Sequence, residues 1–92
     1  MKKFKITVEY CPKCKWMLRA AWIAQELLIT FEEEIDEISL KPSGISGIFR
    51  LYVDDKVAFD RKENGGFAEP KRYKQLIRDH VNPLKSLGHS EH

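Results

Sequence analysis

The two cysteines of this chain, Cys11 and Cys14, lie between a run of residues typical of a strand and a run typical of a helix. Residues 4–10 alternate and are rich in β-forming side chains, as expected of a half-buried strand. Residues 15–31 contain neither Gly nor Pro, which favours a helix. A disulfide between two cysteines so close would close too short a loop to restrict the unfolded chain much. We therefore expect the pair to serve chemistry rather than stability.

The composition is that of an ordinary globular domain. The 92 residues include 16 Lys and Arg and 14 Asp and Glu, mixed along the chain, and the net charge is +2. This balance gives no electrostatic argument for binding nucleic acid. We expect a single domain over residues 1–85 and a frayed, disordered polar tail over residues 86–92.

Polar residues interrupt both segments that might direct the chain into or across a membrane. Thr7, Glu9 and Lys13 break any apolar stretch of an N-terminal signal peptide. The longest apolar run, residues 16–29, contains Arg19 and two further polar side chains, so it is not expected to span a membrane. We expect a cytoplasmic protein, whose thiols would be mostly reduced at rest in that compartment.

The order of the patterned segments predicts one domain of the α/β class. Pro12 and Pro70 fit the first positions of two helices, and Asn82-Pro83 ends the second. Residues 54–56 read as a short hairpin connection, and residues 64–66 as a flexible turn. The expected strands cover 3–9, 34–40, 47–53 and 57–62, and the expected helices cover 12–30 and 70–81.

The first expected helix carries a broad apolar stripe. Its centre follows helical spacing, and further apolar residues widen it, so we expect the helix to be largely buried against a sheet. Trp16 is expected in the core rather than on a lip around the thiols, whereas Tyr10 fits either place. An exposed Trp22 would mark a contact surface. The stripe comprises Trp16, Ala20, Ile23, Leu27 and Phe31, widened by Met17, Ala21, Ala24 and Leu28.

The position of the thiols predicts redox chemistry. Unpaired N–H groups and the dipole at a helix N-terminus favour negative charge, so the pKa of Cys11 should fall below its usual value of about 8.5. Lys13 and Lys15 act in the same direction. A thiolate so placed attacks a disulfide, a glutathione mixed disulfide or a peroxide, and the second thiol resolves the adduct. A CxxC at a strand-to-helix corner of an intracellular protein is typical of such chemistry.

Metal binding is the main alternative for two such thiols. A zinc site needs four ligands, and the missing two would have to come from His80, His89 and His92, of which the last two lie in the expected tail. Copper carriers also place a CxxC after their first strand, since two thiolates suit Cu(I). Their order is strand-helix-strand-strand-helix-strand, whereas three successive strands are predicted here. Haem attachment requires His after the second cysteine, where this chain has Lys15.

Residues 8–14, the hairpin end at 59–62 and the block 65–71, which opens with Gly65-Gly66-Phe67, together resemble the selenoprotein W family. This family belongs to the wider Rdx-type group of thioredoxin-like selenoproteins W, T and H. The resemblance extends over nearly the whole chain, through the final helix. It implies a thioredoxin-like β-α-β-β-β-α domain with the CxxC at the junction of strand 1 and helix 1.

The resemblance also implies a redox role for Cys11 and Cys14, with glutathione or thiol- and disulfide-bearing proteins as partners. Selenocysteine-containing members carry that residue at the position of Cys14, so the chain is identified as a cysteine homologue. Helix-terminus electrostatics nominate Cys11 as the attacking thiol, whereas the selenocysteine position nominates Cys14. The two roles are therefore left open.

Substrate docking is expected to differ from that of ordinary thioredoxins, which place a cis-proline opposite the CxxC. Pro42 is the one proline in the middle of the chain, and it falls in an expected loop between two strands. We expect the loop from Ser43 to Gly47 to supply the backbone for docking instead. That expectation requires Gly44 and Gly47 to lie near the cysteines.

Three candidate functions follow, all with Cys11 and Cys14 as the working pair. The first is a thiol–disulfide oxidoreductase or glutathione-dependent peroxide reductase, with glutathione as co-substrate and no bound cofactor or metal. The second is a non-catalytic module whose binding to a partner protein depends on the state of the disulfide. The third is a carrier of Cu(I) or zinc. We expect no nucleic-acid or membrane partner, and a monomer or weak dimer.

Overall fold

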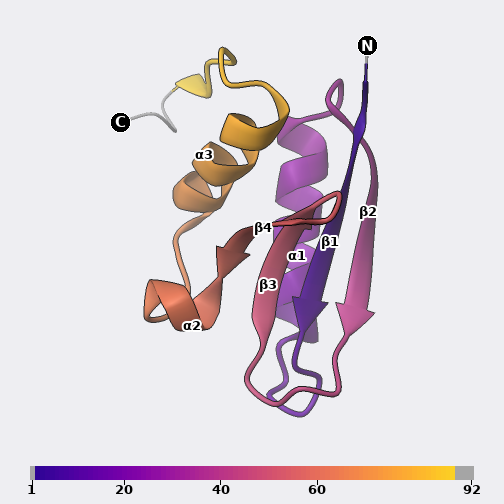
Figure 1. Ribbon diagram of the computed structural model, residues 1–92, viewed down its shortest axis with the longest axis vertical. Coiled ribbons are helices and arrows are strands. Elements are labelled where there is room, and N and C mark those ends of the chain that lie inside the picture. The colour runs from indigo at the N-terminus through magenta and orange to yellow at the C-terminus, as the bar shows by residue number, and fades with distance from the viewer. Residues whose placement is uncertain (1, 89–92) are drawn as a thin grey trace.

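The computed structural model describes residues 2–88 and confirms the predicted order of elements (Figure 1). One short helix, α2, is added between the last strand and the final helix. The elements are β1 (Phe4–Tyr10), α1 (Met17–Thr30), β2 (Ile35–Pro42), β3 (Phe49–Val53), β4 (Lys56–Asp60), α2 (Arg61–Asn64) and α3 (Pro70–Val81).

The four strands form one mixed sheet in the order β2-β1-β3-β4. β1 runs parallel to β2 and antiparallel to β3, and β4 pairs antiparallel with β3. α1 lies behind the sheet in Figure 1 and α3 beside it, so the helices cover one face and leave the other open. At the lower end of the view, the end of β1 meets the start of α1 and the loop before β3. This end carries both cysteines.

The hydrophobic core lies between the sheet and the two longer helices. In β1, Ile6, Val8 and Tyr10 face the core and alternate with polar residues on the open face, as the period of a strand requires. The sequence left Tyr10 open between the core and a lip around the thiols, and the structure places it in the core. The buried cluster consists of Ile6, Val8, Tyr10, Ala20, Ile23, Leu27, Phe31, Ile35, Phe49, Leu51, Val53, Phe59, Tyr73 and Ile77.

The apolar stripe of α1 is narrower than predicted. Ala20, Ile23 and Leu27 are fully buried at its centre, but Met17 and Leu28 are 47% and 42% exposed. The sheet covers one side of α1, and these two side chains lie off that side. The prediction that α1 would be largely buried is therefore wrong for its outer face, which also exposes apolar side chains at Leu18, Trp22 and Ile29.

The first helix begins later than predicted, at Met17 instead of Pro12. Residues 12–15 form a turn in which the Lys15 N–H donates to the Pro12 carbonyl at 3.0 Å. Lys15 has φ +65°, a left-handed conformation that a right-handed helix does not continue. Both cysteines therefore precede the helix.

The fourth strand ends earlier than predicted, at Asp60 rather than residue 62. The Asp60 side chain accepts a hydrogen bond from the Lys62 N–H at 3.0 Å and thereby caps α2. β2, in contrast, continues past its predicted end to Pro42, because its ladder with β1 continues to Tyr10.

The segment after α3 packs back onto the domain. Lys85 Nζ lies 3.2 Å from Oε2 of Glu34, and Leu87 packs against the core. The predicted tail, 86–92, includes residues 89–92, which lie outside the described part of the chain. The boundary at residue 85 stays a prediction. Within residues 2–88, no helix combines the length and apolar character needed to cross a membrane.

Candidate redox site

The two cysteines form a disulfide between one buried residue and one that is only partly buried. Cys11 follows directly after β1, Cys14 lies in the turn before α1, and their Cα atoms are 5.3 Å apart. Cys11 is 1% exposed, whereas Cys14 is only half-buried. The structure thus brings the predicted pair together and leaves one of its members open to a reactant.

The late start of α1 changes the electrostatic argument for Cys11. The unpaired N–H groups of a helix belong to its first turn, and their effect fades within about one turn. Trp16 is the N-cap residue and provides no side-chain cap. Cys14 lies two residues before Trp16, whereas Cys11 lies further away along the chain. The assignment of Cys11 to the helix N-terminus was wrong, and the helix field acts more directly on Cys14.

A cavity of about 160 Å³ lies between the cysteine turn and the loop before β3. The predicted docking loop therefore shares a cavity with Cys11, which Gly44 lines and Gly47 does not. Pro42 is the last residue of β2, and residues 2–88 contain no cis peptide bond, so no cis-proline supports the site. The lining residues are Cys11, Pro12, Lys13, Ser43, Gly44, Ile45 and Ser46.

Ser43 fixes the start of this loop. Its N–H donates to the Tyr10 carbonyl at 2.9 Å, and its hydroxyl oxygen accepts from the Ile45 N–H at 3.1 Å. The Ser43 side chain also hydrogen-bonds Glu9. Ser43 thus joins the loop to the end of β1, immediately before Cys11.

Glu9 is a nearly buried carboxylate beside this anchor. Burial alone would raise its pKa, but hydrogen bonds from Tyr52 and Ser43 and the nearby charges of Lys41 and Arg50 outweigh burial and lower the pKa. Glu9 is therefore ionised at neutral pH. It holds the loop as an acceptor, not as a proton donor.

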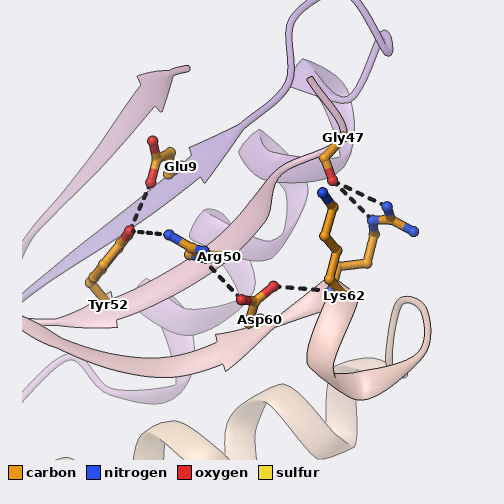
Figure 2. A network of polar contacts seen from close by, with 7 residues as sticks. Glu9, Gly47, Arg50, Tyr52, Asp60 and Lys62 are labelled. Atoms are coloured by element: carbon orange, nitrogen blue, oxygen red, sulfur yellow. Dashed lines mark hydrogen bonds and ion pairs between the residues drawn. The ribbon is translucent and has the colours of Figure 1, made fainter. Parts of the chain in front are cut away.

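The Glu9 carboxylate belongs to a polar network across the open face of the sheet (Figure 2). Tyr52 donates to Glu9 at 2.8 Å, and Arg50 donates to the Tyr52 oxygen at 3.4 Å. Arg50 also donates to Asp60 at 3.1 Å. The network connects the strand that leads into the cysteines with the cap of α2.

Trp16, the second residue after Cys14, packs against two phenylalanines. Its ring centroid is 4.9 Å from that of Phe67 and 6.5 Å from that of Phe49, both in edge-to-face geometry. The guanidinium of Arg19 lies over the ring of Phe67, with its Cζ 3.9 Å from the ring centroid. The expected core role of Trp16 is confirmed, since the ring packs against the buried cluster, although the side chain is only half-buried.

The block Gly65-Gly66-Phe67 has a structural explanation. Gly65 and Gly66 adopt φ values of +80° and +145°, which side chains other than hydrogen rarely allow. Their N–H groups donate to the Lys62 and Arg61 carbonyls at 3.2 and 2.9 Å and end α2. The chain then returns toward α1, and Phe67 reaches Trp16. The block therefore supports the residues that follow Cys14.

Arg61 also touches this region, and sequence reasoning missed it together with Glu9, whereas Ser43 was expected only as the start of the docking loop. Its guanidinium donates to the Gly47 carbonyl and lies over the Trp16 ring at 4.9 Å. No motif marks these residues, because each acts through a contact between segments distant in the sequence. The one sequence signal for Glu9 was its place as a polar residue near the end of the strand that leads into the CxxC motif.

Among the described residues, no histidine completes a zinc site around the cysteines. His80 lines a cavity with Phe4, at the start of β1, whereas Cys11 follows the end of that strand. A strand of seven residues separates these two ends by about 20 Å at ~3.3 Å per residue. His89 and His92 lie outside the described residues. Residues 2–88 contain no cluster of three or more His, Cys, Asp or Glu side chains able to hold a metal ion.

The fold and the cysteine pair together define a thioredoxin-like α/β domain with a redox-related role. Residues 5–79 match the Rdx family, to which this chain belongs. The predicted resemblance to selenoprotein W-related proteins is thereby confirmed.

Solved structures and curated relatives agree with this assignment. A selenoprotein W-related protein from Vibrio cholerae superposes with a TM-score of 0.83 at 43% identity, covering 88% of this chain and 100% of its own. A protein from Bordetella parapertussis superposes with a TM-score of 0.81 at 45% identity, covering 87% of this chain and 100% of its own. Migration and invasion enhancer 1 from Bos taurus is 30% identical over 94% of this chain and 74% of its own length. The Mus musculus protein of that name is 31% identical over 92% of this chain and 73% of its own length.

Proposed function

We propose that the protein is a thiol–disulfide oxidoreductase in which Cys14 is the attacking thiol and Cys11 the resolving thiol. The observation that carries the proposal is the unequal exposure of the bonded pair, with Cys11 1% exposed and Cys14 half-buried. Reactive cysteines are partly exposed and lie in positively charged surroundings, here next to Lys13 and Lys15. The reactive position of the family also falls on Cys14.

The exchange proceeds in two balanced steps. The Cys14 thiolate attacks one sulfur of a partner disulfide, a mixed disulfide forms, and the other partner sulfur leaves as a thiolate that takes up a proton. The Cys11 thiolate then attacks the Cys14 sulfur, closes the Cys11–Cys14 disulfide and releases the second partner thiol. The protein has lost two electrons and the partner disulfide has gained two.

Glutathione is the co-substrate that we propose for regenerating the dithiol. Two glutathione thiols reduce the Cys11–Cys14 disulfide and become oxidised glutathione, which balances the cycle. Glutathione carries two carboxylates, and the cavity beside Cys11 offers the ammonium of Lys13 together with Ser43 and Ser46. The first glutathione thiolate attacks Cys14, which is the less buried of the two cysteines. A cytoplasmic setting supplies glutathione in reduced form.

A binding module controlled by the disulfide is the second candidate function. It is favoured by the apolar residues Leu18, Trp22 and Ile29, which α1 exposes along one side beyond Cys14. Exposed apolar side chains grouped in this way mark contact surfaces. In this alternative, partner binding would change with oxidation while turnover stayed negligible.

Trapping experiments test the proposed roles. The Cys11→Ser variant should accumulate mixed disulfides on Cys14, which mass spectrometry identifies, because the resolving thiol is missing. The Cys14→Ser variant should trap little and lose glutathione-linked disulfide reduction. Wild-type turnover in the Cys14→Ser variant would refute the assignment. Identical partners under oxidising and reducing conditions, in a pull-down, would refute the binding alternative.

A further inference from the structure

We propose that Arg61 is a positioning residue that holds the loop 43–47 beside the cysteine turn, an inference that rests on the proposed disulfide exchange. Arg61 is the first residue of α2, well away from the CxxC in sequence, and its side chain is half-buried. It contacts the loop through hydrogen bonds and the segment after Cys14 through its guanidinium face.

The first contact fixes the end of the loop. Nε and Nη2 of Arg61 donate to the Gly47 carbonyl oxygen at 3.3 and 3.1 Å. Gly47 has φ +78°, a conformation that brings this carbonyl to the guanidinium at little steric cost. Ser43 is bonded to Tyr10 at the other end of the loop. The lining residues between them are therefore held at both ends.

The second contact ties the same side chain to the cysteine turn. Cζ of Arg61 lies 4.9 Å from the ring centroid of Trp16 and 5.6 Å from that of Phe67. A guanidinium over an aromatic ring is attracted by the negative face of the ring. Trp16 follows Cys14 by two residues, so Arg61 sets the distance between the docking loop and the turn that carries the attacking sulfur.

The support behind Arg61 is rigid. The Asp60 carboxylate caps α2 through the Lys62 N–H at 3.0 Å and is held by Arg50 at 3.1 Å. Arginine suits this position because its planar group makes two hydrogen bonds in its plane while its face rests on a ring. Lysine has one compact charge and reproduces only part of this arrangement.

The consequence for reactivity depends on the size of the substrate. A disulfide within a polypeptide approaches Cys14 with its backbone along the loop, so the placement of the loop governs its reaction. A displacement of about 1 Å in a positioning element can lower a rate by up to ~10²-fold. A small disulfide without a peptide backbone does not need the loop to reach the half-buried Cys14.

The test compares two disulfides across matched variants. Insulin serves as the polypeptide disulfide and bis(2-hydroxyethyl) disulfide as the small one, each reacted with the reduced protein. We expect Arg61→Ala to lower the second-order rate constant for insulin about tenfold and that for the small disulfide less than about twofold. Arg61→Lys should restore part of the loss. Arg72→Ala removes the same side chain and charge from an exposed position on α3 and should leave both rates unchanged.

A spectroscopic measurement separates this inference from the proposed function. The carbonyl carbon resonance of Gly47 should shift in Arg61→Ala, because a hydrogen bond to that oxygen is lost, and should not shift in Arg72→Ala. Equal loss with both disulfides, or an unshifted Gly47 resonance in a folded Arg61→Ala protein, would overturn the positioning role. Absence of exchange in the wild-type protein would refute the proposed function, and the Gly47 resonance would then decide whether Arg61 holds the loop.

Discussion

The hydroxyl of Tyr52 donates a hydrogen bond of 2.8 Å to the carboxylate of Glu9, two residues before Cys11. Glu9 receives a second hydrogen bond from Ser43, at the start of the docking loop. A nearly buried carboxylate is stable only where such donors replace water. The pair therefore connects the open face of the sheet to the loop that faces the cysteines.

Replacing Glu9 should weaken both the fold and the loop. In Glu9→Gln, the charge that strengthens both hydrogen bonds is lost, so we expect the free energy of unfolding to fall by about 1–3 kcal/mol, measured by urea denaturation at pH 7. Ser39→Ala, on the same open face in the edge strand β2, is the control and should change it by less than about 0.5 kcal/mol. A Glu9→Gln protein as stable as the wild type would contradict this role.

The second buried carboxylate, Glu34, gives the fold a defined response to acid. Burial alone would raise its pKa, but hydrogen bonds from Asn82 and Lys85 and the charge of Lys85 outweigh burial and lower it from the usual 4.5. Because its pKa is lowered in the folded state, ionised Glu34 stabilises the fold. This contribution is complete above pH 4.5 and is lost as the pH falls through the lowered pKa.

We therefore expect Glu34→Gln to be less stable than the wild type at pH 7 by about 1–3 kcal/mol, with the difference shrinking below the usual pKa of glutamate. Urea denaturation at a series of pH values measures it. Glu33→Gln changes the neighbouring exposed glutamate and serves as the control. A stability difference that stayed constant down to strongly acidic pH would show that the Glu34 charge is not responsible.

The sequence predicted those features that repeat along a single element. The spacing of Ala20, Ile23 and Leu27 follows the turn of a helix, and all three are buried. The predicted start of α1 was wrong because Pro12 favours a first helical position, while no sequence signal marks the left-handed backbone conformation of Lys15. The four residues of α2 are too few for any periodic pattern.

The candidate site, too, was predictable only in those features that are local in the sequence. The CxxC motif identifies its own chemistry, because the spacing of two thiols is local. The exposure difference between Cys11 and Cys14 depends on how the turn packs, and the bond from Arg61 to Gly47 joins positions 14 residues apart. Contacts of this kind are decided by the tertiary fold, which a single sequence does not display.

The unequal burial of the two cysteines should appear in their alkylation rates. In the fully reduced protein we expect iodoacetamide to modify Cys14 at least about tenfold faster than Cys11, because Cys14 is half-buried whereas Cys11 is 1% exposed. Digestion and mass spectrometry at successive times give both rates. In guanidinium chloride the two rates should become similar. Faster modification of Cys11 in the folded protein would reverse the proposed roles.

Gly65 offers a test of how the backbone after α2 supports the cysteine turn. Its φ of +80° is left-handed, and nothing lies within 4 Å of the position that a Cβ would take. Any cost of Gly65→Ala is therefore backbone strain and not a clash, and we expect about 1–2 kcal/mol of destabilisation. Urea denaturation measures this cost.

Gly44→Ala is the matched control for stability, because Gly44 also has open space around it but needs no left-handed conformation. It should change the free energy of unfolding by less than about 0.5 kcal/mol. Strain at Gly65 would also loosen the return of Phe67 onto Trp16, whose ring centroids are 4.9 Å apart. In a Trp22→Phe background, Trp16 fluorescence should therefore move to longer wavelength in Gly65→Ala and stay unchanged in Gly44→Ala. Unchanged fluorescence in both variants would show that the turn at Gly65 does not support the packing of Phe67 on Trp16.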